Sequence, residues 1–320
     1  MKVINIAIIG CSSIAERMVL PAIKENKLFN LVMVGSRTEG KGKQFAEKFN
    51  CRYGSYNDVL STDDVDAIYV SVPSGLHYEW GKKVIEAKKH LLLEKPFTDT
   101  LEHSKEIIDI ADEFKLIAME GLAYIFHPWF QELKKLLADN IIGDVRLLES
   151  SFGFPLLPIT DVRNDFSIGG GAILDNLIYP LSISLNIFGS KYVKKDCTIH
   201  YNKDLNIDER GFLRIDWENS AAHLSYGFGF SYKNTLEIWG TKGSIFIDRV
   251  FTKPKTMITE IMVKKNNEVL IYSVLPADQF SLMLHAFYNK IFGFDKSCIN
   301  EKLDILSRME IISEMYRKKF

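Results

Sequence analysis

A repeated order of strand and helix in the first part of the chain is the feature that most constrains the fold. Apolar runs of strand length occur at residues 3–9, 31–35, 67–72, 90–93 and 116–119. Helix-like stretches separate these runs at residues 14–25, 41–49, 78–87 and 100–114. Strands joined by helices of this length predict β-α-β units, and therefore a parallel sheet with helices on both faces.

The pattern changes after about residue 120. The stretches that follow are a helix at 129–139, a strand at 145–154, a loop at 155–168, a helix at 172–188, strand-like segments from 193 to 275, and helices at 279–291 and 302–317. This order predicts an α+β domain with a mostly antiparallel sheet. A chain of 320 residues also fits two domains at about 150 residues each. We expect an α/β dinucleotide-binding domain at 1–121 and a substrate-binding and oligomerisation domain at 122–320.

One predicted strand has two unlike faces. In "HLSYGFGFSY" the even positions are Leu224, Tyr226, Phe228 and Phe230, and the odd positions are Ser225, Gly227, Gly229 and Ser231. Because side chains alternate across a strand, one face is apolar and largely aromatic and the other nearly bare. A bare face permits close approach of another layer, which is either the domain's own helices or a second subunit.

The stretch "IAIIGCSSIAERM", residues 6–18, has the form of a dinucleotide-binding turn. Gly10 occupies the first position of a G-x-G-x-x-G/A fingerprint and Ala15 the last, but Ser12 stands where the middle glycine is expected. We expect Ser13 to cap the helix that begins at Ile14. A hydroxyl of Ser12 or Ser13 can donate to a phosphate, and the helix N-terminus offers free N–H groups.

The end of the second strand indicates which dinucleotide would bind. A carboxylate at this tip is typical of NAD sites, whereas here the tip reads Ser36-Arg37. A hydroxyl and a guanidinium can bind a 2′-phosphate through charge-assisted hydrogen bonds. The tip therefore favours NADP(H); the alternative is that Arg37 stacks on the adenine or points into solvent.

Two further stretches bring chemistry to the strand ends and to a helix. Lys95 follows the fourth strand in "LLLEKPF", at the edge where parallel sheets bind ligands. Asp175 and Tyr179 lie four residues apart in "GGGAILDNLIYPL", on one face of a helix. The three glycines that open this helix permit close approach of a ligand or another backbone.

Composition excludes several classes of partner. The net charge of −1 and scattered lysine pairs argue against nucleic acid. No apolar stretch is long enough to span a membrane. The four cysteines, Cys11, Cys51, Cys197 and Cys298, have no metal-ligand spacing, so we expect no metal and a reducing compartment. With strand-like residues starting at Val3 and no room for a signal peptide, we expect a cytoplasmic protein.

Together these motifs resemble the glucose-fructose oxidoreductase, inositol dehydrogenase and rhizopine catabolism (Gfo/Idh/MocA) family. The likeness is carried by the turn at 10–15, by Glu94-Lys95-Pro96 and by the G-G-G-x-x-x-D-x-x-x-Y helix, and it extends to "VSVPSGLHYEW" and "LEIWGTKGSIFID". Tyr179 replaces a histidine found in many sugar dehydrogenases. This tyrosine and the stretches around it are similar to the NADPH-dependent C-3 ketoreductases of nucleotide-linked deoxysugars, which also tend to lack the middle glycine.

The resemblance implies a Rossmann domain followed by a domain with an open-faced sheet, and assembly into a homodimer or homotetramer. It implies NADP(H) as cofactor and a nucleotide-linked keto sugar as substrate. The catalytic residues would be Lys95, Tyr179 and Asp175. The residues implied at the cofactor are Gly10, Ser12, Ser13, Ile14, Ser36, Arg37, Ser71, Pro73, His77, Glu94 and Arg163.

The implied roles leave alternatives open. Tyr179 is the candidate acid, with an ordinary tyrosine pKa of about 10 that the Lys95 ammonium would lower; Lys95 is the rival acid. Asp175 would orient Lys95 or hold a sugar hydroxyl. Arg163 would hold the nicotinamide end or the sugar pyrophosphate, or form only a loop salt bridge. The segment "AYIF" before His127 lacks an arginine that many relatives carry, so we expect a substrate contact there to be lost or changed.

Two other functions remain possible at this stage. The first is oxidation of a free sugar, a polyol or a dihydrodiol by the same fold. The second is a cofactor-bound regulator without catalysis, which would not need Lys95 and Tyr179 together. Fold alone does not decide among them.

Overall fold

The computed structural model describes residues 2–295 and 301–317. Its contacts divide the chain into two compact units. The first comprises Met1–Ala123 and Gln279–Met309, and the second comprises Tyr124–Asp278 and Glu310–Phe320. The first unit thus includes Gln279–Met309, a segment that the expected boundary at residue 122 places in the second domain.

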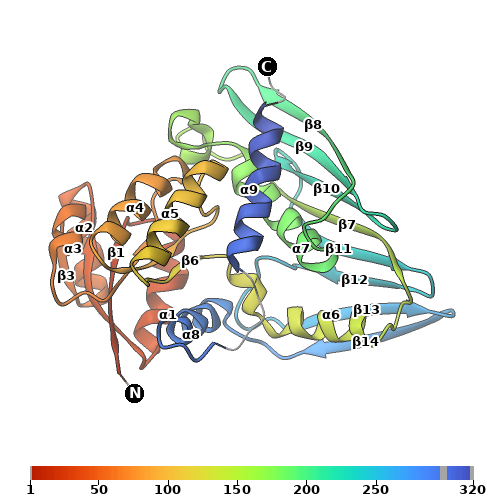
Figure 1. Cartoon of the computed structure of the whole chain (residues 1–320), viewed down its shortest axis with the longest axis horizontal. Coiled ribbons are helices and arrows are strands. Elements are labelled where there is room, and N and C mark those ends of the chain that lie inside the picture. The colour runs from red at the N-terminus through yellow and green to blue at the C-terminus, as the bar shows by residue number, and fades with distance from the viewer. Residues whose placement is uncertain (1, 296–300, 318–320) are drawn as a thin grey trace. The chain divides into compact units, whose positions relative to one another are not determined.

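The first unit is built on a parallel sheet (Figure 1). Its strands are β1 (Ile4–Ile9), β2 (Phe29–Gly35), β3 (Arg52–Gly54), β4 (Ala67–Val70), β5 (His90–Leu93) and β6 (Ala118–Glu120). They lie in the order β3-β2-β1-β4-β5-β6, and every neighbouring pair is parallel. This is the doubly wound dinucleotide-binding order, in which right-handed crossovers place helices on both faces. The predicted Rossmann domain is confirmed.

The helical segments of this unit mostly match the predicted ones. They are η1 (Ala15–Val19), α1 (Leu20–Glu25), α2 (Glu39–Phe49), α3 (Tyr56–Ser61), η2 (Ser74–Leu76), α4 (His77–Glu86), α5 (Leu101–Glu113) and α8 (Gln279–Ile291). Helix α9 (Glu301–Arg317) has its first part in this unit. Sequence patterns missed β3 and α3, because a strand of three residues and a helix of six are too short to show a period.

Helix α8 belongs to the first unit because its apolar face packs against α1. The Tyr288 ring meets Phe29 of β2 edge-on, with 6.1 Å between centroids. The Tyr288 hydroxyl donates to the carbonyl of Lys2 at 3.0 Å. These contacts join segments from opposite ends of the sequence, and local patterns in the chain contain no sign of them.

The second unit is built on a larger sheet (Figure 1). Its strands are β7 (Val145–Phe154), β8 (Lys194–Asn202), β9 (Ile207–Asp216), β10 (Ala221–Phe228), β11 (Lys233–Gly240), β12 (Ser244–Asp248), β13 (Thr259–Lys265) and β14 (Glu268–Val274). Their order is β14-β13-β12-β11-β7-β10-β9-β8. The pairing of β7 with β10 is parallel and the others are antiparallel. The predicted mostly antiparallel sheet is confirmed.

One face of this sheet is covered by helices of the same unit. The helical segments are η3 (Ala123–Phe126), α6 (Pro128–Ala138), η4 (Val162–Asn164), η5 (Phe166–Ile168), η6 (Ile173–Leu177) and α7 (Ile178–Phe188). Both η6 and α7 contact β7 and β10, and α6 contacts β13 and β14.

The two faces of β10 correct part of the sequence interpretation. Leu224, Tyr226 and Phe228 are 1–2% exposed, whereas His223 of the alternate face is exposed and Ser225 is half-buried. The apolar, aromatic-rich face, rather than the bare one, therefore lies against the unit's own helices. Phe230 lies beyond the end of β10 and is 42% exposed, so it does not extend this face.

Two sequence expectations concern composition. Within the described part of the chain, every helix is too short or too polar to span a bilayer. Cys11, Cys51 and Cys197 are thiols rather than halves of a disulfide, and Cys298 lies outside the described residues.

Candidate active site

The turn after β1 brings Gly10 against the neighbouring strand. Gly10 has a φ of +101°, and a Cβ at this position would lie 2.3 Å from the carbonyl oxygen of Ser71, just after β4. The Ser71 N–H in turn donates to Ile9 at 2.8 Å. Glycine is therefore required at the first fingerprint position for close approach of two strand ends.

Ser12, not Ser13, caps the helix that follows. The Ser12 hydroxyl accepts the Ala15 N–H at 3.1 Å, which corrects the expected cap at Ser13. Ser12 Oγ also shares a 2.5 Å hydrogen bond with Ser71 Oγ. Ser13 is exposed and Ile14 is half-buried in the first turn. A serine at the middle position thus stabilises the turn, and phosphate contacts of these residues stay predictions.

The end of β2 presents a cation without a neighbouring carboxylate at the tip. Ser36 is 8% exposed, and its hydroxyl donates to the Thr38 carbonyl at 2.9 Å and accepts the Thr38 N–H at 3.2 Å. Arg37 is exposed beside Tyr56. Glu39 pairs with Lys43 at 2.6 Å. Of the two tip residues, Arg37 is the exposed one, and its contact with a 2′-phosphate stays a prediction.

The segment after β5 exposes one side chain. Residues 91–98 are buried except Lys95, which is half-buried. Glu94 is 8% exposed, and its carboxylate accepts a hydrogen bond from the Tyr69 hydroxyl at 2.5 Å. The Lys95 side chain therefore extends from a buried strand end, whereas the Glu94 side chain points inward. A cofactor contact of Glu94 stays a prediction.

His77, at the start of α4, holds the same segment from behind. It is 1% exposed, with Nδ1 2.6 Å from the Pro96 carbonyl and Nε2 2.9 Å from the Val72 carbonyl. Burial lowers the pKa of His77, so the ring is neutral and donates to one of the two oxygens. Nε2 thus faces the backbone just before Pro73, and Nδ1 faces the segment after β5. A cofactor contact of His77 or Pro73 stays a prediction.

In the second unit, Asp175 and Tyr179 share one side of a helix. From 171 to 185 every residue is buried except these two, which are half-buried. The Tyr179 ring lies in an aromatic cluster, with centroids 5.0 Å from Phe152 and 5.3 Å from Phe251. The expectation that Asp175 and Tyr179 lie on one face is met, and the phenol is held by packing on one side.

The glycines before this helix make room for protein groups. A Cβ on Gly171, whose φ is +128°, would lie 2.3 Å from Asp208 Oδ1. A Cβ on Gly170 would lie 2.6 Å from the carbonyl oxygens of Arg163 and Asp165. The close approach expected here is thus provided by a carboxylate and by backbone of the chain.

Asp208 of β9 is a residue that sequence reasoning missed. It is 2% exposed, and its carboxylate accepts the Ile173 N–H at 2.5 Å and the Tyr316 hydroxyl at 3.0 Å. Burial raises its pKa to about 7, although these hydrogen bonds oppose the shift. Asp208 therefore caps, from a distant strand, the helix that carries Asp175 and Tyr179. A single acidic residue in a strand gives no sequence signal for this role.

Arg163 is engaged by acidic residues of its own unit. Its Nε and Nη2 donate to the two Asp161 oxygens at 2.9 Å each, and Nη1 lies 3.6 Å from Asp175 Oδ2. Its guanidinium also lies 5.5 Å from the Phe154 ring centroid. The loop salt bridge considered from sequence is therefore present, and contact of Arg163 with cofactor or substrate stays a prediction.

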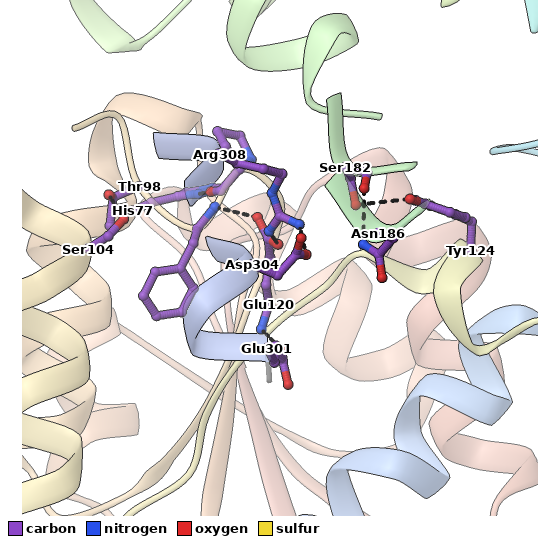
Figure 2. Close-up of polar contacts among 12 residues, drawn as sticks. His77, Thr98, Ser104, Glu120, Tyr124, Ser182, Asn186, Glu301, Asp304 and Arg308 are labelled. Carbon is purple, nitrogen blue, oxygen red and sulfur yellow. Dashed lines mark hydrogen bonds and ion pairs between the residues drawn. The ribbon is translucent and has the colours of Figure 1, made fainter. Parts of the chain in front are cut away.

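The segment "AYIF", where an arginine was expected, is buried at Ala123, Tyr124 and Ile125 and half-buried at Phe126. Tyr124 is 0% exposed and donates from its hydroxyl to Ser182 Oγ at 2.9 Å, while Asn186 Nδ2 donates to the Ser182 carbonyl at 3.0 Å (Figure 2). Tyr124 also belongs to the aromatic cluster around Tyr179, with 6.3 Å between the two ring centroids. Lys95 belongs to the first unit and Tyr179 to the second, so their predicted pairing stays a prediction.

Comparison with known proteins agrees along almost the whole chain. Residues 4–122 match the family described as "Oxidoreductase family, NAD-binding Rossmann fold", and residues 130–246 match the "GFO/IDH/MocA C-terminal domain". The dTDP-3,4-didehydro-2,6-dideoxy-alpha-D-glucose 3-reductase of Saccharopolyspora spinosa is 33% identical over 91% of this chain and 88% of its own length.

Two solved structures are similar as well, both of KijD10, a 3-ketoreductase from Actinomadura kijaniata, with TDP-benzene and NADP bound. The form with a tyrosine replaced by phenylalanine has a TM-score of 0.94 and 28% identity, covering 99% of this chain and 98% of that one. The form with a lysine replaced by alanine has a TM-score of 0.89 and 27% identity, covering 97% and 96%. The motifs, the two folds and these similarities establish that the chain belongs to the Gfo/Idh/MocA family of oxidoreductases.

Proposed function

We propose that the chain is an NADPH-dependent reductase of the C-3 keto group of a deoxysugar carried on a nucleoside diphosphate. The observation that carries this proposal is the 33% identity, over 91% of the chain, with a reductase of a dTDP-linked 3-keto sugar. The structure supports it because Lys95 and Tyr179 each emerge from buried surroundings. A regulator without catalysis would not require either side chain.

The donor groups of the first unit fit a nicotinamide dinucleotide with a 2′-phosphate. The capped helix after Gly10 offers N–H groups and a positive dipole end to a pyrophosphate. Arg37 is exposed at the end of β2 and would bind the 2′-phosphate. Lys95 follows β5, at the edge of a parallel sheet where ligands bind.

When bound, NADPH supplies the hydride that reaches C-3 of the sugar. The two electrons of the carbonyl π bond then move to its oxygen, which becomes an alkoxide. Tyr179 donates its phenolic proton to that oxygen and is reprotonated from solvent. Lys95 stabilises the negative charge as it develops and lowers the pKa of the phenol.

The other site residues hold these two groups. Asp175 would accept a hydrogen bond from a sugar hydroxyl or orient Lys95, and Arg163 would bind the sugar pyrophosphate or the nicotinamide end after release from Asp161. The assembly is a homodimer or homotetramer in this proposal. A cytoplasmic location and the lack of nucleic-acid, membrane and metal partners stay predictions from composition.

Incubation of the purified protein with dTDP-3,4-didehydro-2,6-dideoxyglucose and NADPH deuterated at C4 tests the proposal. We expect NADPH to be consumed and one deuterium to appear at C-3 of the sugar, observed by NMR. Free xylose and a trans-dihydrodiol, each with NADP⁺, are the control substrates. Turnover of a control substrate without reduction of the keto sugar would favour the free-sugar or dihydrodiol alternative.

A further inference from the structure

A buried cluster of charges lies behind the segment that carries Lys95. Glu120, at the end of β6, is 2% exposed, and Arg308 of α9 is 1% exposed. One guanidinium nitrogen of Arg308 pairs with Glu120 Oε2 and another with Asp304 (Figure 2). Glutamate and arginine side chains are rarely buried unless they are paired, and here they are paired with each other.

The second carboxylate oxygen of Glu120, Oε1, binds the backbone close to Lys95. Glu120 Oε1 accepts the Phe97 N–H at 2.8 Å, two residues beyond Lys95. The Glu120 N–H itself donates to Glu301 Oε1 at 2.9 Å, and Glu301 pairs with Lys290 at 3.2 Å. The carboxylate is thus fixed by α9 on one side and directed at Phe97 on the other.

Beyond Lys95, the peptide group between Pro96 and Phe97 is held at both ends by buried side chains. His77 Nδ1 lies 2.6 Å from its carbonyl oxygen, that of Pro96, and Glu120 accepts its N–H, that of Phe97. Strand β5 is fixed as well, since the Gly121 N–H donates to Leu93 at 2.6 Å. The backbone from which the Lys95 side chain starts is therefore clamped before and after the lysine.

A buried ion pair is weak evidence of stabilisation, because desolvation offsets the attraction between the charges. A charged acceptor does orient an N–H more strongly than a neutral one. We infer that Glu120, held by Arg308, is a positioning residue that sets the backbone behind Lys95 and so the place of its ammonium group. Since Lys95 acts on the substrate only in the proposed function, Glu120 affects catalysis through that role.

The test compares Glu120→Ala with Glu120→Gln, because the Gln side chain keeps an oxygen that can accept the Phe97 N–H. Misplacement of a catalytic group by about 1 Å can cost about 10²-fold, so we expect kcat of Glu120→Ala to fall by about that factor. KM for the keto sugar and Kd for NADPH should change less than about threefold. Glu120→Gln should recover about tenfold of the lost kcat. If Glu120→Ala does not fold, Glu120→Gln alone should show the remaining fall in kcat, about tenfold, with unchanged KM.

Lys302→Ala is the matched control. Lys302 lies on α9, the helix that carries Arg308, but is exposed and pairs with the exposed Asp112. We expect its kcat to equal that of wild type. Equal losses of kcat in Lys302→Ala and Glu120→Gln would mean that any change at the contact between α9 and the sheet disturbs the enzyme, and would overturn the inference.

The decisive measurement repeats Glu120→Gln in a Lys95→Ala background. If Glu120 acts through Lys95, the second substitution should change the single-turnover rate by less than about twofold, since groups that act as a unit are not additive. If Glu120→Gln lowers the single-turnover rate by the same factor in both backgrounds, the inference is overturned and the proposed function stays intact. A wild-type protein that does not reduce the keto sugar would overturn the proposed function, and this role of Glu120 with it.

Discussion

We expect cofactor choice to depend on Arg37. It is exposed at the end of β2, where the tip has no carboxylate that would repel a 2′-phosphate. We expect Arg37→Ala to weaken NADPH binding by at least about tenfold, or about 1.4 kcal/mol, and to leave NADH binding nearly unchanged. Fluorescence titration of each reduced cofactor measures both values. Tenfold tighter binding of NADH than NADPH by the wild type would contradict the assignment.

Asp208 makes stability depend on pH. Burial raises its pKa from 3.8 to about 7, so the folded state holds a proton that the unfolded state releases at lower pH. The contribution of this group to the free energy of unfolding is greatest below about pH 4 and falls as pH rises to about 7. We expect Asp208→Asn to lower the free energy of unfolding, relative to wild type, by less at about pH 8 than at about pH 5.

Urea unfolding of the wild type and of Asp208→Asn at those two pH values gives the comparison. The Asn amide oxygen can still accept the Ile173 N–H, so the helix cap is kept in the variant. An identical pH dependence in both proteins would show that Asp208 is not the group responsible.

At the scale of residues, the sequence predicted what a local motif contains and missed what distant partners supply. Lys95, Asp175 and Tyr179 follow from short patterns, and the structure finds each half-buried among buried neighbours. Glu120 and Asp208 were not predicted. Glu120 meets Arg308 across 188 positions and Asp208 meets Ile173 across 35, and no periodicity in the sequence joins such pairs.

Among the secondary structure elements, the helix that begins after Gly171 depends on a close fit. A Cβ at Gly171 would lie 2.3 Å from Asp208 Oδ1, and the φ of +128° is strained for any side chain. We expect Gly171→Ala to destabilise the protein by about 1–3 kcal/mol and to lower kcat by moving Tyr179. Denaturant unfolding and steady-state kinetics measure the two effects.

Gly40 is the matched control for this substitution. It lies in helix α2, and a Cβ there would meet nothing within 4 Å. Gly40→Ala should stabilise the protein by about 0.5–1 kcal/mol, since alanine loses less backbone entropy in a helix. Equal stability of Gly171→Ala and wild type would show that the contact with Asp208 is not tight.

Elements with a clear period were predicted well and short ones were not. Strands β5 and β7 and helix α8 have the predicted bounds. The helices after Gly10 and after Gly171 each include a five-residue π-helical turn, Ala15–Val19 and Ile173–Leu177, which side-chain patterns do not reveal. The packing of α8 on α1 was missed because only tertiary contacts decide it.

For the whole molecule, we expect assembly to depend on the side of the larger sheet opposite to the unit's own helices. We call it the open face; it includes Ser225 of β10, its partner Phe212 of β9 and Trp239 of β11. Phe212 is 54% exposed and Trp239 is 50% exposed. Large apolar side chains exposed on one sheet face are typical of an interface.

We expect a homodimer or homotetramer that forms through the open face. Ser225→Lys should lower the mass in solution toward that of one chain, and Gln44→Lys, on the exposed side of α2, should not. Gly227 is a poor site for this test, because a Cβ there would lie 2.4 Å from the Arg210 Cβ. Sedimentation at micromolar protein gives the mass. A wild-type monomer at every concentration would contradict the expectation.

The central claim is that Lys95 and Tyr179 act together on the alkoxide that forms at C-3 of a nucleotide-linked keto sugar. The most direct test is the single-turnover rate of NADPH oxidation in wild type, Lys95→Ala, Tyr179→Phe and the double variant. General acid catalysis contributes about 10²–10⁴-fold, so Tyr179→Phe should lose a factor in that range. The double variant should be little slower than the slower single variant. Full activity in Tyr179→Phe alone would assign the proton to Lys95, and full activity in both single variants would contradict the mechanism.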